Sequence, residues 1–120
     1  MQKKKQKKKI LIIDDEPMIG IAIKSAMPEY DFVIASCAKH GLDILSRYEF
    51  DIVLLDYMMA DMDGLEMLKQ IRLINESLKI VMITGSDNYS IILKAMNFRA
   101  NGFLFKPFDA DKLMDLIQQV

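Results

Sequence analysis

Five side chains suited to phosphoryl chemistry follow short apolar segments of this 120-residue chain. Three are the carboxylates Asp14, Asp15 and Asp56, one is the hydroxyl of Thr84 and one is the ammonium of Lys106. If the apolar segments are neighbouring parallel strands, all five side chains converge at one edge of a sheet. That edge would hold a cation between carboxylates, with a hydroxyl and an ammonium facing them. This combination suits the handling of a phosphoryl group on Asp56, since a carboxylate can itself attack phosphorus.

The carboxylates predict a magnesium site, because three like charges at close range repel one another unless a cation lies between them. Oxygen-only ligands are those that Mg²⁺ prefers. Cys37 and His40 lie in a different stretch of the sequence, so they do not indicate zinc, and we expect both to be structural or exposed. The simpler alternative is that these aspartates only cap the helices that follow them.

The elements that must position these residues alternate along the chain. We expect strands at 9–13, 32–35, 51–55, 80–83 and 102–105, and helices at 17–27, 38–48, 64–74, 88–96 and from 109 onward. The segment 10–13 is apolar at every position, as in strands that helices cover on both faces. The pattern predicts an α/β domain with a doubly wound, five-stranded parallel sheet flanked by five helices.

The composition predicts a soluble cytoplasmic protein without membrane insertion. Hydrophobic residues make up 52% of the chain and charged residues 28%. The longest apolar segments are far shorter than the ~18 residues that span a bilayer, and residues 1–9 do not resemble a secretory signal. The single cysteine, Cys37, cannot form an internal disulfide, which fits a reducing compartment.

The charge is unevenly distributed along the chain. Without the six lysines at positions 3, 4, 5, 7, 8 and 9, ten basic residues face 17 acidic residues, a net charge of about −7. We therefore expect a disordered lysine-rich tail at residues 1–8 and a folded domain at residues 9–120. The acidic body shows no sign of a nucleic-acid groove, although the tail could contact an acidic surface.

The sequence resembles the receiver domain of bacterial two-component response regulators, of the chemotaxis-regulator-like superfamily. The resemblance covers nearly the whole chain and depends on five motifs taken together. They are Ile-Ile-Asp-Asp-Glu-Pro at 12–17, Asp-Ile-Val-Leu-Leu-Asp-Tyr-Met-Met at 51–59, Met-Asp-Gly at 62–64, Ile-Thr-Gly at 83–85 and Gly-Phe-Leu-Phe-Lys-Pro-Phe at 102–108. The resemblance implies a flavodoxin-like fold with strand order 2-1-3-4-5 and a phosphorylation switch.

The resemblance also implies the partners and the metal ligands. A histidine kinase or phosphotransfer protein would donate a phosphoryl group from its phosphohistidine to Asp56. Asp15 and Asp56 would ligate Mg²⁺ directly, together with the backbone carbonyl of Met58, while Asp14 would act through water. The output would be a separate protein target or an effector domain outside this chain.

The switch residues follow from the same resemblance. Lys106 would pair with the phosphoryl group, and its peptide bond to Pro107 would be cis. Thr84 would swing to hydrogen-bond the phosphoryl oxygens, and Phe103 would move inward with it. The alternative for Phe103 is ordinary core packing. The output face, and a candidate homodimer contact, would be the fourth helix, the fifth strand and the fifth helix.

Two other classes of protein compete with this interpretation. An aspartate-nucleophile phosphatase places a second aspartate two residues after the nucleophile, and Met58 at that position argues against turnover of external esters. A flavin carrier of the flavodoxin type needs a phosphate-cradling loop after the first strand. Here Asp14 and Asp15 would repel a cofactor phosphate. The sequence also lacks a glycine-rich phosphate loop with its lysine, which argues against a bound nucleotide.

The loop after Asp56 departs from the family pattern. Ala60 stands where the family often has proline, which predicts a more mobile loop. Met58 and Ser86 occupy the positions that tune phosphoryl lifetime, and we expect the large apolar Met58 to obstruct the attacking water. Met58, Met59 and Met62 crowd this loop, where they either pack or serve recognition.

Overall fold

The computed structural model describes residues 7–85 and 89–120, so the predictions about residues 1–6, Ser86 and Asn88 lie outside the described residues. Strands and helices alternate along the described chain. The strands are β1 (Lys9–Ile13), β2 (Asp31–Ala35), β3 (Ile52–Asp56), β4 (Lys79–Thr84) and β5 (Gly102–Phe105). The helices are α1 (Pro17–Ala26), α2 (Ala38–Arg47), α3 (Gly64–Ile74), α4 (Tyr89–Asn97) and α5 (Ala110–Gln119).

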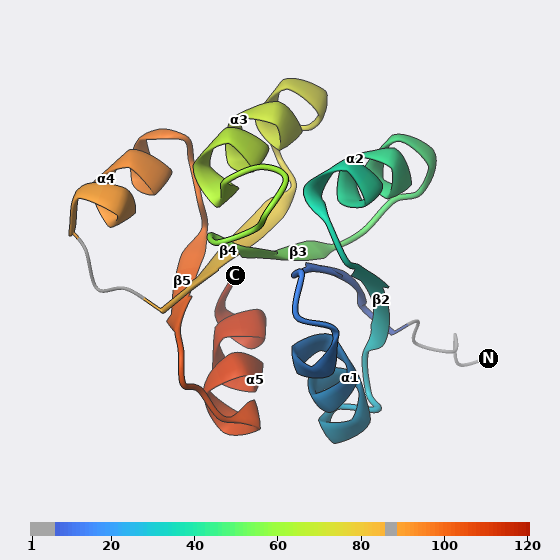
Figure 1. The fold of residues 1–120 in the computed structure, drawn as a ribbon. Coiled ribbons are helices and arrows are strands. Elements are labelled where there is room, and N and C mark those ends of the chain that lie inside the picture. Colours follow the sequence, from blue (N-terminus) through green and yellow to red (C-terminus); the bar gives the residue numbers. More distant parts are fainter. Residues whose placement is uncertain (1–6, 86–88) are drawn as a thin grey trace.

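The five strands form one parallel sheet in the order β2-β1-β3-β4-β5. Helices α2, α3 and α4 cover one face of the sheet, and α1 and α5 cover the other (Figure 1). This arrangement confirms the doubly wound α/β fold and the strand order. The chain reverses its winding direction between β1 and β3, which is where ligands bind in such sheets.

The central strands are buried on both faces. In β1, the side chains of Leu11 and Ile13 belong to the apolar cluster beneath α2, α3 and α4, whereas Ile10 and Ile12 belong to the cluster beneath α1 and α5. All four side chains are fully buried. Since successive side chains of a strand point to opposite faces, this double burial explains why the run is apolar at every position.

Two strands end later than the sequence predicts, and both extensions include a site residue. Asp56 is the last residue of β3 and pairs with Ile83, while Thr84 is the last residue of β4 and pairs with Phe105. A polar side chain does not end a parallel ladder, because the ladder consists of backbone hydrogen bonds. Asp56 and Thr84 are therefore held by the sheet itself.

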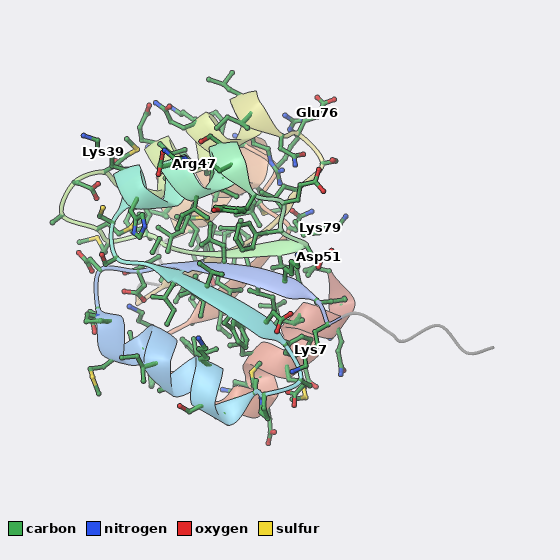
Figure 2. The ribbon with its side chains drawn as sticks, turned by 90° about the vertical axis from the view of Figure 1, so that its right-hand side faces the viewer. Lys7, Lys39, Arg47, Asp51, Glu76 and Lys79 are labelled. Carbon is green, nitrogen blue, oxygen red and sulfur yellow. The ribbon has the colours of Figure 1, made fainter. Side chains whose placement is uncertain are left out.

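Lys7, at the start of the described chain, lies away from the carboxyl edge of the sheet. Figure 2 shows Lys7 and Asp51 at one end of the molecule and Lys39, in the first turn of α2, toward the other. The Lys7 ammonium donates to the carbonyl of Pro28 at 3.0 Å. Among the described residues, every helix is too short or too polar to cross a bilayer.

Candidate functional site

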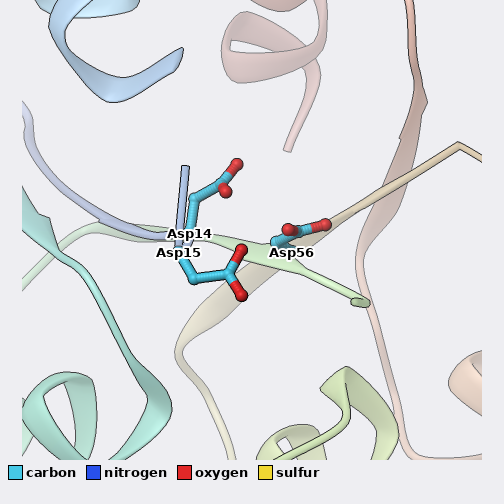
Figure 3. A group of neighbouring side chains, drawn as sticks. All are labelled: Asp14, Asp15 and Asp56. Atoms are coloured by element: carbon cyan, nitrogen blue, oxygen red, sulfur yellow. The ribbon is translucent and has the colours of Figure 1, made fainter. Parts of the chain in front are cut away.

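Three carboxylates meet at the point where the winding direction reverses. Asp14 and Asp15 follow β1 directly, and Asp56 ends the neighbouring strand β3. One oxygen of each carboxylate lies within 4.8 Å of the other two, and Figure 3 shows Asp15 extending toward Asp56 with Asp14 beside them. Asp14 and Asp56 are only 1% and 2% exposed, whereas Asp15 is exposed. The structure thus brings together the three predicted acidic residues.

Lys106 supplies a positive charge at this edge. Its Nζ lies 3.6 Å from Oδ1 of Asp56, 3.8 Å from Oδ2 of Asp14 and 3.9 Å from Oε1 of Glu16. Its backbone N–H donates to the carbonyl of Thr84 at 2.8 Å. Glu16 is not among the predicted site residues, although its place directly after the two aspartates is a signal that could have found it.

The environment of Asp56 disfavours its charged form. Burial, followed by the negative charge of Asp14, raises the pKa of Asp56 from 3.8 to about 6. The Lys106 ammonium and the N–H of Met58, 3.4 Å from Oδ1, oppose this rise in pKa. One ammonium therefore does not fully compensate the buried carboxylates, and the site is suited to a further cation.

The donor atoms fit a divalent cation. Oδ1 of Asp14 accepts the backbone N–H of Glu16 at 2.9 Å. Oδ2 of Asp14 is buried and has no hydrogen-bond partner within the described parts of the chain. The Lys106 ammonium lies 3.8 Å from this oxygen, but a buried carboxylate oxygen that accepts no hydrogen bond is still costly, so a cation or its bound water would stabilise it. The donors are all oxygens, which suits Mg²⁺.

The other predicted residues lie around the carboxylates. Thr84 is 2% exposed at the end of β4, next to the backbone of Lys106. The peptide bond between Lys106 and Pro107 is cis. Phe103 packs against the apolar cluster beneath α2, α3 and α4, and its partner in the ladder is Met82 of β4.

The loop between β3 and α3 borders the site through contacts with Asp56 and Asp15. Met59 and Met62 pack against the core cluster, so packing is confirmed for these two methionines. Met58 is 68% exposed beside Asp56. The same loop contains Ala60, whose backbone N–H donates to Oδ2 of Asp15 at 3.1 Å. Sequence reasoning missed this contact, because a backbone donor leaves no signal in the residue type.

Cys37 and His40 serve α2 and lie outside the carboxylate group. The half-buried Cys37 is the N-cap residue of α2, and its Sγ accepts the backbone N–H of the exposed His40 at 3.4 Å. Both residues are thus structural or exposed, as predicted.

Residues 10–118 match the family model described as the response regulator receiver domain. The chain belongs to this family. Receiver domains of two-component response regulators are signalling switches, and phosphorylation and Mg²⁺ binding are typical of them. The family binds Mg²⁺ at an acidic aspartate pocket, and the cluster of Asp14, Asp15 and Asp56 has that character.

Individual relatives of this receiver domain are similar over nearly the whole chain. This chain is 33% identical over 114 residues to the chemotaxis protein CheY of Listeria monocytogenes, and the match covers 92% of this chain and 96% of that protein. A CheY-like response regulator receiver domain protein from Methanospirillum hungatei superposes with a TM-score of 0.90 at 28% identity, covering 95% and 93%. The response regulator TrrA from Thermotoga maritima, solved in complex with Mg²⁺ and BeF, gives a TM-score of 0.83 at 29% identity, covering 93% and 97%.

Proposed function

We propose that Asp56 accepts a phosphoryl group from the phosphohistidine of a sensor histidine kinase or phosphotransfer protein. The observation that carries the proposal is the place of Asp56, a buried carboxylate 3.6 Å from the Lys106 ammonium and grouped with Asp14 and Asp15. An oxygen of Asp56 forms the new bond to phosphorus as the bond between phosphorus and the imidazole nitrogen breaks. The imidazole takes up a proton as it leaves.

Each neighbouring residue has a proposed role in this transfer. Asp15 and Asp56, with the backbone carbonyl of Met58, would hold Mg²⁺ directly, and Asp14 would hold it through water. When bound, Mg²⁺ neutralises the carboxylates and the charge on the phosphoryl oxygens. Lys106, already within ion-pair distance of Asp56, pairs with the charge of the product.

The response of the domain begins at Thr84. Its hydroxyl would donate to a phosphoryl oxygen, and Phe103 would move inward with it. The changed surface would be the face of α4, β5 and α5, which would act on a separate protein target or on an effector domain outside this chain. Exposed apolar side chains on this face support a role in protein contact, including a candidate homodimer. They are Tyr89, Leu93 and Met96 of α4 and Phe105 of β5.

We further propose that the domain is a cytoplasmic switch and does not turn over external substrates. Its folded part would be residues 9–120, with residues 1–8 as a lysine-rich tail that contacts nucleic acid weakly at most. Met58, which stands where a phosphatase would have a second aspartate, supports the absence of turnover. Steady release of phosphate from a small ester would instead favour the phosphatase function.

The experiment is phosphorylation by acetyl phosphate in the presence of Mg²⁺, followed by intact-protein mass spectrometry. We expect the mass gain of one phosphoryl group in the wild type and none in Asp56→Ala. Asp43→Ala, which removes an exposed carboxylate of α2, serves as the matched control and should be labelled as the wild type is. Labelling that persists in Asp56→Ala would overturn the assignment of the phosphoacceptor.

A further inference from the structure

The loop between β3 and α3 is bonded on two sides by neighbouring residues. On one side, the N–H of Ala60 donates to Oδ2 of Asp15 at 3.1 Å. On the other side, the carboxylate of Asp61 accepts two backbone N–H groups from the first turn of α2. Oδ1 accepts from Ala38 and Oδ2 accepts from Lys39, each at 3.1 Å. Two adjacent residues thus connect α2 to one of the site carboxylates.

The first turn of α2 offers backbone N–H donors to the carboxylate of Asp61. Backbone N–H groups at the start of a helix lack partners within the helix, and they attract negative charge. The N-cap residue of α2 is Cys37, whose Sγ is a weak acceptor, 3.4 Å from the N–H of His40. Asp61 satisfies two further donors of the same turn. The hydrogen bonds from Lys39 and Ala38 hold the pKa of the Asp61 carboxyl below its usual range.

Asp15 has a reason to need a partner. Its side chain is exposed, so burial does not fix the direction of its carboxylate. A hydrogen bond from Ala60 to one oxygen restrains the carboxylate while the other oxygen remains available. Outer partners of this kind orient metal ligands and raise metal affinity. The donor must be a residue other than proline, because proline has no backbone N–H.

We infer that Asp61 is a positioning residue for Mg²⁺: it ties the loop to α2 and thereby keeps the Ala60 N–H against Asp15. The inference rests on the proposed role of Asp15 as a magnesium ligand. Asp61 itself would touch neither the metal nor the phosphoryl group, because both of its oxygens accept N–H groups of α2. It acts through one backbone hydrogen bond, so its effect appears as magnesium affinity before any phosphoryl transfer.

The test is the Mg²⁺ dissociation constant of the unphosphorylated full chain, measured by isothermal titration calorimetry. Asp61→Ala should weaken Mg²⁺ binding roughly tenfold, the lower end of the effect expected for outer partners of metal ligands. Ala60→Pro should weaken it to a similar extent, whereas Ala60→Gly retains the N–H and should bind as the wild type does. Asp61→Ala and Ala60→Pro both act through one hydrogen bond. The variant that combines them should therefore bind Mg²⁺ no more weakly than either single variant.

A matched control separates positioning from general stability. Asp63 lies in the same loop and caps α3, where its Oδ1 accepts the N–H of Glu66 at 2.9 Å. Asp63→Ala should lower the melting temperature as Asp61→Ala does but leave the Mg²⁺ dissociation constant close to that of the wild type. Equal losses of Mg²⁺ affinity in the two variants would overturn the inference, and this comparison decides the matter even if Ala60→Pro does not fold.

Failure of the inference differs from failure of the proposed function. If the wild type does not bind Mg²⁺, or if Asp15→Asn binds it normally, the proposed metal site is wrong. If the wild type binds Mg²⁺, Asp15→Asn does not, and Asp61→Ala retains the wild-type affinity, only the positioning role is wrong.

Discussion

Nζ of Lys106 lies 3.6 Å from Oδ1 of Asp56, although β4 separates the strands that lead to these two residues. The carbonyl of Thr84, at the end of β4, accepts the backbone N–H of Lys106 at 2.8 Å and fixes the start of the side chain. The ammonium then reaches past β4 to Asp56 and also to Asp14, 3.8 Å away. A single cation therefore serves two buried carboxylates.

Removal of this cation should separate phosphorylation from metal binding. Lys106→Met should slow the phosphorylation of Asp56 by acetyl phosphate roughly ten- to a hundredfold, because a positioned charge on the transferred group is lost. The same variant should bind Mg²⁺ more tightly, since a competing positive charge is gone. Lys106→Arg, which keeps the charge, should fall between the wild type and Lys106→Met in both measurements. A wild-type phosphorylation rate in Lys106→Met would contradict the role given to Lys106.

The raised pKa of Asp56 predicts how stability depends on pH in the absence of Mg²⁺. Burial, then the charge of Asp14, raises the pKa from 3.8 in the unfolded chain to about 6 in the fold. The folded state then holds the proton more tightly than the unfolded state. The contribution of Asp56 to the free energy of unfolding is therefore greatest below pH 3.8 and is lost as the pH rises through about 6.

Asp56→Asn should therefore stabilise the metal-free protein at pH 7.5 by up to roughly 3 kcal/mol relative to the wild type. The gain should shrink toward zero at about pH 3, below both pKa values, where the wild-type carboxyl is protonated in the folded and in the unfolded state. Urea denaturation in EDTA at the two pH values measures the difference. Asp43→Asn, at an exposed position of α2, serves as the control without such a gain. Added Mg²⁺ should stabilise the wild type more than Asp56→Asn, because the variant lacks one ligand.

The sequence predicts the fold and the meeting of the acidic residues, because strand-end positions in a parallel sheet share one edge. Asp14 and Asp56 follow from that rule alone. The bonds of Asp61 do not, because its partners lie 22 and 23 residues away and are backbone groups. The burial of Arg72 is equally hard to predict from the sequence, since a basic residue in the last turn of a helix usually faces solvent and interacts with the helix dipole. Local patterns locate side chains on elements, but distant backbone partners depend on how the elements pack.

The buried Arg72 gives a stability prediction outside the site. Nη1 donates to the carbonyl of Leu78 at 2.6 Å, and Nη2 donates to Oδ1 of Asn101 at 3.0 Å, so the guanidinium joins the end of α3 to the segments before β4 and β5. Arg72→Met should lower the free energy of unfolding by about 2–3 kcal/mol, because buried acceptors lose charged donors. Arg47→Met provides the contrast and should change the free energy of unfolding by less than about 0.5 kcal/mol. Its ion pair with Asp43 is 67% and 55% exposed.

Met58 gives a prediction about the lifetime of the phosphorylated state. The side chain is 68% exposed, and its N–H lies 3.4 Å from Oδ1 of Asp56, so it stands beside the carboxylate that would carry the phosphoryl group. A large apolar side chain there should hinder the water that attacks phosphorus, whereas an amide can hydrogen-bond that water. Met58→Asn should therefore lose its phosphoryl group several-fold faster than the wild type.

The measurement for Met58→Asn is the decay of phosphorylated protein after removal of acetyl phosphate, followed on phosphate-affinity gels in excess Mg²⁺. Met96→Asn, which changes an exposed methionine of α4, controls for the loss of surface apolar area and should decay as the wild type does. Excess Mg²⁺ matters because the carbonyl of residue 58 is a proposed ligand, and saturation removes any effect of altered metal affinity. A decay rate in Met58→Asn equal to or slower than that of the wild type would show that the side chain does not shield the phosphoryl group.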